Sequence, residues 1–91
     1  MQTAKGKIVA ACDLEILGDS YSEDGVKLDI KEDFYGGEEV DLEGVTDALE
    51  RFFTANLAGN QLVEALVEAG VVQEEEIETV DGVKHVQLFR V

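Results

Sequence analysis

The residues of this chain that could take part in chemistry are few and stand far apart. His85 is the single histidine and Cys12 the single cysteine among 91 residues. A histidine acts as a general base when a nucleophile lies beside it, and no Ser or Cys motif accompanies His85. Cys12 lies within an apolar run, which is typical of a small buried residue and not of a reactive thiol. We therefore expect no catalytic residue, no metal site and no cofactor.

An acidic loop over residues 32–39 (EDFYGGEE) is the first segment that could hold a ligand. Its Gly-Gly pair precedes a helix start, where backbone N–H groups can bind phosphate. The neighbouring acids would repel a phosphate and already complement the helix dipole, and no Lys-Ser or Lys-Thr pair follows. We expect a structural turn with Phe34 or Tyr35 packed beneath it.

Residues 19–31 hold several acids around Gly25, as calcium-binding loops do. When Gly25 is aligned to the glycine of such a loop, Lys31 stands where a bidentate Glu is required. A strand pattern follows in place of the expected helix. The sequence thus excludes a calcium hand, and weak divalent binding by scattered carboxylates stays open.

Acidic residues dominate the composition. The chain has 21 Asp and Glu against 7 Lys and Arg, a net charge of −14, and 14 of these acids fall within residues 13–50. Such a surface repels nucleic acid and anionic membranes. We therefore expect neither direct nucleic-acid binding nor membrane contact.

The single cysteine and the lengths of the apolar runs indicate the cellular compartment of the protein. One cysteine excludes an internal disulfide, and no apolar run approaches the length of a membrane span. We expect a cytoplasmic protein, in a salt-rich cytosol that screens the self-repulsion of the carboxylates. An ordinary acidic cytosolic protein is the alternative.

Apolar periodicity predicts the strands that position these residues. Residues 7–13 (KIVAACD) form a short apolar run, typical of a central strand that is covered on both faces. A helical turn over residues 14–18 and a turn over residues 19–25 follow. From Val26 to Lys31 apolar and polar residues alternate, which predicts a strand with one face in water.

The first predicted helix begins after Asp41, a suitable N-cap, and its apolar positions recur at helical spacing as far as Phe53. Residues 55–59 (ANLAG) break the pattern. Asn56 tolerates the left-handed conformation that ends helices, so we interpret it as a cap.

The second predicted helix covers residues 60–69 and ends at Gly70. Its polar stripe is narrow, and apolar side chains surround most of its circumference. One small sheet needs less apolar surface than this helix offers. We expect the remainder to be buried against another subunit.

Residues 77–80 and 83–91 predict a β-hairpin, because Asp81-Gly82 between them supplies the positive φ angles of a type I′ turn. The chain as a whole predicts one α+β domain over residues 1–91. We expect a two-layer sandwich: a mostly antiparallel three- or four-stranded sheet, two consecutive helices on one face, and the C-terminal hairpin.

A small group of cations interrupts the acidic surface if the first strand pairs with the last. This basic island consists of Lys5, Lys7, Lys84, His85 and Arg90. It would attract an anion or an acidic partner. The alternative is that these side chains balance local carboxylates.

Several motifs together resemble the archaeal family catalogued as domain of unknown function 424. They are Cys12-Asp13 followed by Leu17-Gly18, the segment 34–37 (FYGG), the segment 55–59 (ANLAG), and Gly82 with His85 and Gln87. Lys84 departs from the proline expected before the histidine. The resemblance covers nearly the whole chain and implies an archaeal, cytoplasmic protein without an assigned activity. It transfers no catalytic residue and marks six candidate ligand-binding positions: Asp13, Phe34, Tyr35, Asn56, His85 and Gln87.

Three hypotheses follow. The first is a non-catalytic interaction module that self-associates through the second helix or the basic island, with another protein as the alternative partner. The second is a ligand-binding or RNA-associated accessory protein that uses His85, Gln87, Asn56 and the basic island. Its weakness is the charge, because nucleic-acid affinity comes largely from neutralised phosphates. The third, an enzyme, requires His85 or a carboxylate with a shifted pKa in a cleft.

Overall fold

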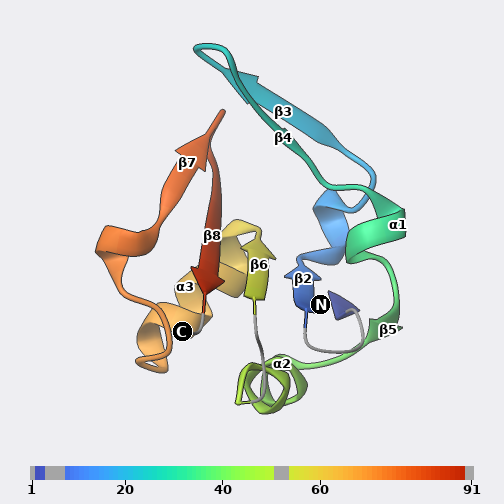
Figure 1. Cartoon of the computed structure of the whole chain (residues 1–91), viewed down its shortest axis with the longest axis vertical. Helices are drawn as coiled ribbons and strands as arrows, with labels where there is room; N and C mark the ends of the chain where they lie inside the picture. The colour runs from blue at the N-terminus through green and yellow to red at the C-terminus, as the bar shows by residue number, and fades with distance from the viewer. Residues whose placement is uncertain (1, 4–7, 51–53, 90–91) are drawn as a thin grey trace.

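A mixed β-sheet forms the centre of the molecule. The computed structural model describes residues 2–3, 8–50 and 54–89. The sheet has six strands in the order β5-β1-β2-β6-β8-β7 (Figure 1). Their bounds are β1 Gln2–Thr3, β2 Ile8–Cys12, β5 Glu38–Glu39, β6 Thr54–Ala58, β7 Glu78–Val80 and β8 Val83–Phe89.

The α+β class and the C-terminal hairpin are confirmed. Three of the expected strands, β2, β7 and β8, lie in this sheet, whereas the strand expected from Val26 pairs with residues 20–23 in a separate two-stranded sheet. The sheet also contains β6, which was not expected, and two strands of two residues each, β1 and β5, extend it at one edge. The pairing of β2 with β6 is parallel, and the other four pairings are antiparallel. Asp81 and Gly82 have φ angles of 51° and 80° and link β7 to β8, as a type I′ turn requires.

Three α-helices accompany the sheet: α1 Glu32–Tyr35, α2 Leu42–Leu49 and α3 Asn60–Glu68. Two single 3₁₀ turns, Leu14–Ile16 and Glu74–Glu76, lie in the connections. Asp41 caps α2 as expected, since its Oδ1 accepts the N–H of Gly44 at 2.9 Å. The helix ends at Leu49, and the expected apolar positions at 52 and 53 lie outside the described residues.

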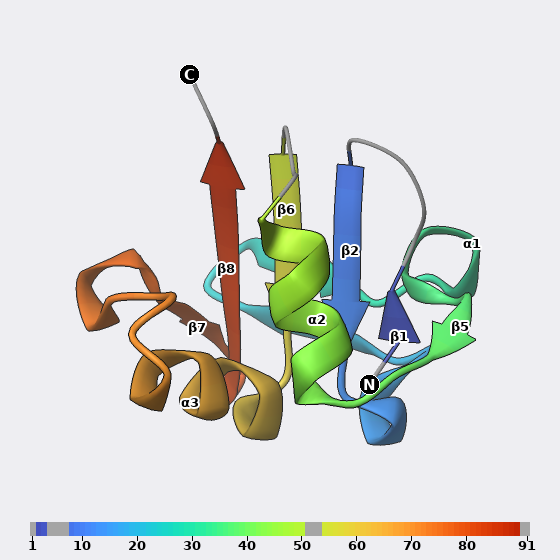
Figure 2. The same cartoon turned by 90° about the horizontal axis from the view of Figure 1, so that it is seen from below.

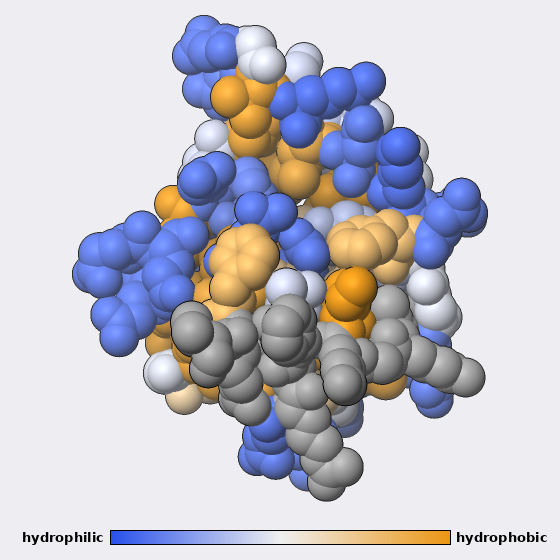
Figure 3. Space-filling view, viewed as in Figure 1, coloured by the Kyte–Doolittle hydropathy of each residue, from blue (hydrophilic) through white to orange (hydrophobic). Residues whose placement is uncertain are grey.

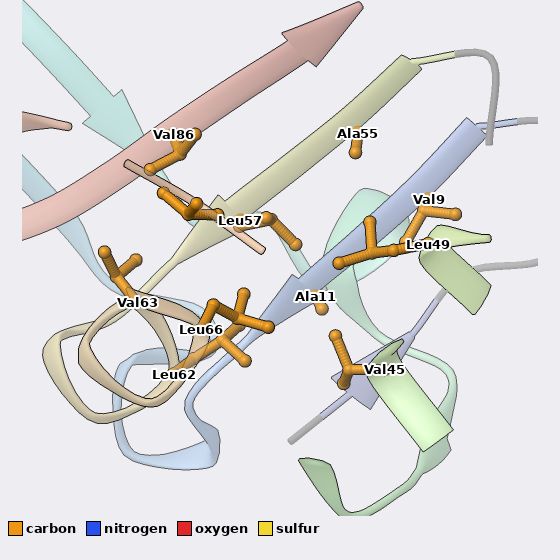
Figure 4. Close-up of a cluster of buried hydrophobic side chains, with 11 residues drawn as sticks. Val9, Ala11, Val45, Leu49, Ala55, Leu57, Leu62, Val63, Leu66 and Val86 are labelled. Carbon is orange, nitrogen blue, oxygen red and sulfur yellow. The ribbon is translucent and has the colours of Figure 1, made fainter. Parts of the chain in front are cut away.

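Helices α2 and α3 lie on the same face of the sheet (Figure 2). They bury a core against inward-facing residues of the three central strands (Figure 4). Its members are Val9, Ala11, Val45, Leu49, Ala55, Leu57, Leu62, Val63, Leu66, Val72 and Val86. The apolar residues of α3 are thus used within the chain: Leu62, Val63 and Leu66 are fully buried. The surplus apolar surface expected on this helix is not found there.

The opposite face of the sheet is covered only in part. The hairpin of β3 (Ser20–Glu23) and β4 (Val26–Asp29) packs there with α1, around Ala10, Cys12 and Ala58. Leu28, Ile30 and Tyr35 are the buried residues that the covering elements contribute. The remainder of this face lies toward the N-terminal end of β2 and the C-terminal end of β8. We call it the open sheet face, and its residues are Ile8, Thr54, Asn56, Gln87 and Phe89.

Two local expectations were wrong. Residues 19–25 were expected to form a turn, but residues 20–23 form the strand β3, and only Asp24-Gly25, with positive φ angles of 51° and 83°, forms the turn that closes β3 onto β4. Residues 55–59 are not a loop: residues 54–58 form β6, the strand between β2 and β8. Asn56 therefore lies within a strand and caps no helix.

Candidate functional site

On the side of the sheet that contains the open sheet face, register places the residues of β2, β6 and β8 in three rows. Ile8, Thr54 and Phe89 form the outermost row across β2, β6 and β8. The next row is Ala10, Asn56 and Gln87, and the third is Cys12, Ala58 and His85. Directly opposed residues project to the same face, so three of the predicted site residues share this surface: Asn56, His85 and Gln87.

Asn56 and Gln87 form a polar pair in the middle row. The Gln87 side-chain Nε2 donates to Asn56 Oδ1 at 3.0 Å. Asn56 is half-buried and Gln87 exposed. The bond joins neighbouring strands and fixes the orientation of both amides.

Apolar side chains border this pair. Phe89 is 70% exposed and Ile8 49% exposed in the outermost row, and Phe34 on α1 is 40% exposed. The Phe34 ring stands edge-on to Tyr35, which packs on this face of the sheet, with ring centroids 5.1 Å apart. In Figure 3 hydrophobic atoms lie on both sides of a hydrophilic group near the middle of this face.

His85 lines a hollow beside the apolar row. Its side chain is 16% exposed, and Nε2 lies 3.5 Å from Glu78 Oε2. The other ring nitrogen, Nδ1, is buried and has no hydrogen-bond partner among the residues that the structure describes. The hollow has a volume of about 240 Å³ and is lined by Glu76, Glu78, His85, Gln87 and Phe89.

Asp13 acts at a different part of the molecule, the first turn of α3. It follows β2, and its carboxylate accepts the N–H groups of Gln61 at 3.0 Å and Leu62 at 3.1 Å, in the first turn of α3. Asp13 is 8% exposed, and burial raises the pKa of its carboxyl above 3.8, while the two N–H bonds act in the opposite direction. The contacts of Asp13 make it a helix cap supplied from a distant strand.

Tyr35 and Cys12 are buried together beneath the covering elements. Burial, with the neighbouring Cys12, raises the pKa of Tyr35 to about 12. Burial, with the neighbouring Asp13, raises the pKa of Cys12 to about 11. A thiol of such high pKa is almost wholly protonated at neutral pH, which agrees with the interpretation of Cys12 as a structural residue.

The strand pairing on which the expected basic island depended is not found. β6 lies between β2 and β8, so the first long strand does not pair with the last. Lys84 and His85 are adjacent on β8 and project to opposite faces, and Lys84 Nζ lies 3.8 Å from Glu64 Oε2 on α3. Lys5, Lys7 and Arg90 lie outside the described residues.

The family model described as protein of unknown function (DUF424) matches residues 1–91. The chain belongs to the DUF424 family. No curated protein matches the chain. A similar solved structure is the crystal structure of an uncharacterized conserved protein from Methanopyrus kandleri, with 28% sequence identity and a TM-score of 0.70. The likeness covers 96% of this DUF424 chain and 88% of that chain.

Four residues that the surface of this DUF424 chain uses were absent from the sequence-based candidates: Ile8, Glu76, Glu78 and Phe89. The sequence pattern of the predicted β7–β8 hairpin was sufficient to identify two of them, Glu78 and Phe89. A two-residue turn at Asp81-Gly82 places Glu78 opposite His85, and Phe89 falls on the same face as His85 by alternation. Glu76 is positioned by a 3₁₀ turn that the sequence pattern did not predict.

Among the residues that the structure describes, no group of three His, Cys, Asp or Glu side chains is arranged to hold a metal ion. Over the same residues, every helix is too short or too polar to cross a membrane.

Proposed function

We propose that this protein is a non-catalytic interaction module that binds a protein with a basic surface on its open sheet face. The observation that carries the proposal is the outermost cross-strand row, where Ile8 and Phe89 are 49% and 70% exposed. Exposed apolar residues are ordinary when they are scattered, whereas a grouped set marks a contact surface. Phe34, 40% exposed on the neighbouring α1, enlarges the group.

The surface has the composition of an interface. Protein contacts combine apolar area with polar groups that form hydrogen bonds, and here the hydrogen-bonded Asn56 and Gln87, which lie between the apolar residues, supply those polar groups. Burial of apolar area stabilises a complex by about 25 cal/mol per Å² before the costs of association are subtracted. A ring as exposed as Phe89 is therefore the expected anchor.

Charge favours a basic occupant. Exposed acids stand beside both ends of the apolar group, Glu32 and Asp33 on α1 and Glu76 and Glu78 near Phe89. The net charge of −14 steers cationic proteins toward the molecule, whereas a second copy would bring the same negative charge. RNA is opposed by the carboxylates, which repel its phosphates.

Self-association was the first hypothesis from the sequence, and it was based on apolar residues of α3. The residues of α3 that were expected to face a second subunit, Leu62, Val63 and Leu66, are buried in the chain's own core. A second copy on the open sheet face is now the competing occupant. It is tested in the same experiment.

The test is a selection of displayed random peptides on the purified protein, followed by fluorescence anisotropy with the peptides that are selected. We expect them to combine apolar residues with Arg or Lys. Phe89→Ser should weaken their binding about tenfold or more, as loss of an interface anchor does. The matched control is Val71→Ser, which changes a residue that is 38% exposed and lies outside the open sheet face.

Two outcomes would overturn the proposal. In one, the selected peptides bind wild type and the Phe89→Ser variant equally. In the other, sedimentation velocity at molar KCl shows a dimer that Phe89→Ser dissociates, which makes a second copy the occupant of this face.

A further inference from the structure

We propose that the hollow beside His85 holds the guanidinium group of one arginine of the basic partner. This inference rests on the proposed function and specifies which side chain of the partner enters the open sheet face. The hollow, about 240 Å³ in volume, lies beside the exposed Phe89 and contains both carboxylates of that end of the surface.

Both carboxylates have a contact within the chain. Glu76 Oε1 accepts the backbone N–H of Gln73 at 2.9 Å, in a capping box of the 3₁₀ turn. Glu78 Oε2 lies 3.5 Å from Nε2 of His85, and the Glu78 side chain is 75% exposed. The hydrogen bond restricts Glu76, which therefore loses less conformational entropy when a cation binds, and the exposed Glu78 is accessible to the cation.

The remaining walls suit a flat cation. The aromatic ring of Phe89 lines the hollow, and a guanidinium stacks favourably on the face of an aromatic ring. The amide of Gln87 is oriented by its bond to Asn56 and lines the same hollow. Arginine combines planar stacking with bidentate binding of carboxylates, whereas lysine offers a point charge.

Size and charge point to one side chain as the ligand. Pockets for small-molecule ligands usually measure about 300–1,000 Å³, which is larger than this hollow. None of its five described lining residues is Lys or Arg. Another hollow, of about 290 Å³, lies on the side of β8 to which Lys84 projects; it is lined by Glu64, Glu68 and Glu74 and also by Lys84 of this chain, 3.8 Å from Glu64.

The experiment is an NMR titration of the full chain with N-acetyl-arginine methylamide. The corresponding citrulline compound, which has the same shape without the charge, and the lysine compound are titrated in parallel. We expect saturable shifts of the Gln87 side-chain amide and the Phe89 ring with arginine. Lysine should bind about two- to fivefold more weakly, and citrulline should give no saturable shift.

Variants localise the binding. Glu78→Gln and Phe89→Leu should each weaken arginine binding about two- to fivefold. The matched control is Glu75→Gln, which removes the same charge from the adjacent 3₁₀ turn but does not line the hollow. Backbone spectra show that each variant is folded, and a nuclear Overhauser contact between arginine δ-protons and the Phe89 ring supplies a second measurement.

The proposal is wrong if citrulline binds as well as arginine, or if Glu75→Gln and Glu78→Gln weaken binding equally. It is also wrong if selected peptides bind through Phe89 but tolerate replacement of each arginine, a result that leaves the docking function standing. Conversely, arginine binding without any selected peptide would support the hollow and contradict the docking function.

Discussion

Asp13 shows how one carboxylate can join two distant elements. It receives N–H groups from Gln61 and Leu62, 48 and 49 positions away along the chain. Hydrogen bonds to a charged group are stronger than neutral ones, and they offset part of the cost of burying this carboxyl. Burial nevertheless has the larger effect on the pKa of Asp13, which is raised although the two hydrogen bonds act to lower it.

The sign of this shift gives a pH prediction at the residue scale. Because the folded-state pKa of Asp13 lies above 3.8, the folded state gains a proton before the unfolded state does as pH falls. The wild type should therefore become more stable relative to Asp13→Asn as pH falls from neutral to about 4, and this gain should disappear as pH rises through the folded-state pKa.

Urea unfolding of both proteins over this pH range measures the difference, in which the contributions of the other acids largely cancel. At neutral pH Asp13→Asn should cost about 1–3 kcal/mol, since an amide offers one acceptor oxygen for two N–H donors. A stability difference that shrinks as pH falls would show that the hydrogen bonds outweigh burial.

At the scale of elements, the turn from β6 into α3 depends on Gly59. Its φ angle is +113°, and a Cβ built there would overlap the carboxylate of Asp13. Its N–H donates to the carbonyl of Lys84 on β8 at 2.9 Å. One glycine thus lets a strand, a helix and a carboxylate approach within van der Waals distance.

Gly59→Ala should therefore destabilise the protein by about 3 kcal/mol, through left-handed strain and steric overlap together. The matched control is Gly70→Ala after α3, where φ is +76° and no heavy atom lies within 4 Å of the added Cβ. Strain alone should cost about 1–2 kcal/mol there. Equal losses in thermal or urea unfolding would mean that the contact with Asp13 is not tight.

The sequence predicted elements with strong local signals and missed those defined by tertiary pairing. The hairpin of β7 and β8 follows from Asp81-Gly82, and α2 follows from Asp41 and its apolar spacing. Residues 54–58 contain Asn and small residues with little strand preference, and they form β6 because β2 and β8 lie on both sides.

The candidate site was likewise predictable where local pattern defines it and not where tertiary pairing does. His85 and Gln87 share a face by strand alternation, and Asn56 joins them only after residues 54–58 are known to pair with β8. Asp13 adjoins β2 in sequence but turns toward α3, a contact between residues 48 positions apart that local pattern cannot reveal. The sequence predicted that Phe34 or Tyr35 packs beneath the acidic loop, and Tyr35 is the buried one while Phe34 is exposed.

At the scale of the whole molecule, 14 of 21 acids lie within residues 13–50, which include the β3–β4 hairpin, α1 and α2. Like charges at this density oppose the compact state, and salt screens them over about 3 Å at 1 M. The midpoint of thermal unfolding should therefore rise by about 5 °C between low salt and 1 M KCl, which corresponds to about 1 kcal/mol.

Differential scanning calorimetry in a KCl series measures this effect. Sorbitol serves as the control, because it stabilises compact states without screening charge. A midpoint that KCl leaves unchanged would mean that self-repulsion contributes little to the stability of the fold.

The position of β6 has a consequence for the order of folding. Thr54 pairs with Ile8, 46 positions earlier, and with Phe89, 35 positions later. Both pairings close long loops, so the middle of the sheet must form after the local hairpins and limits the folding rate. A chain cut on either side of β6 leaves two fragments, neither of which contains a complete sheet, and only their reassociation can restore the open face.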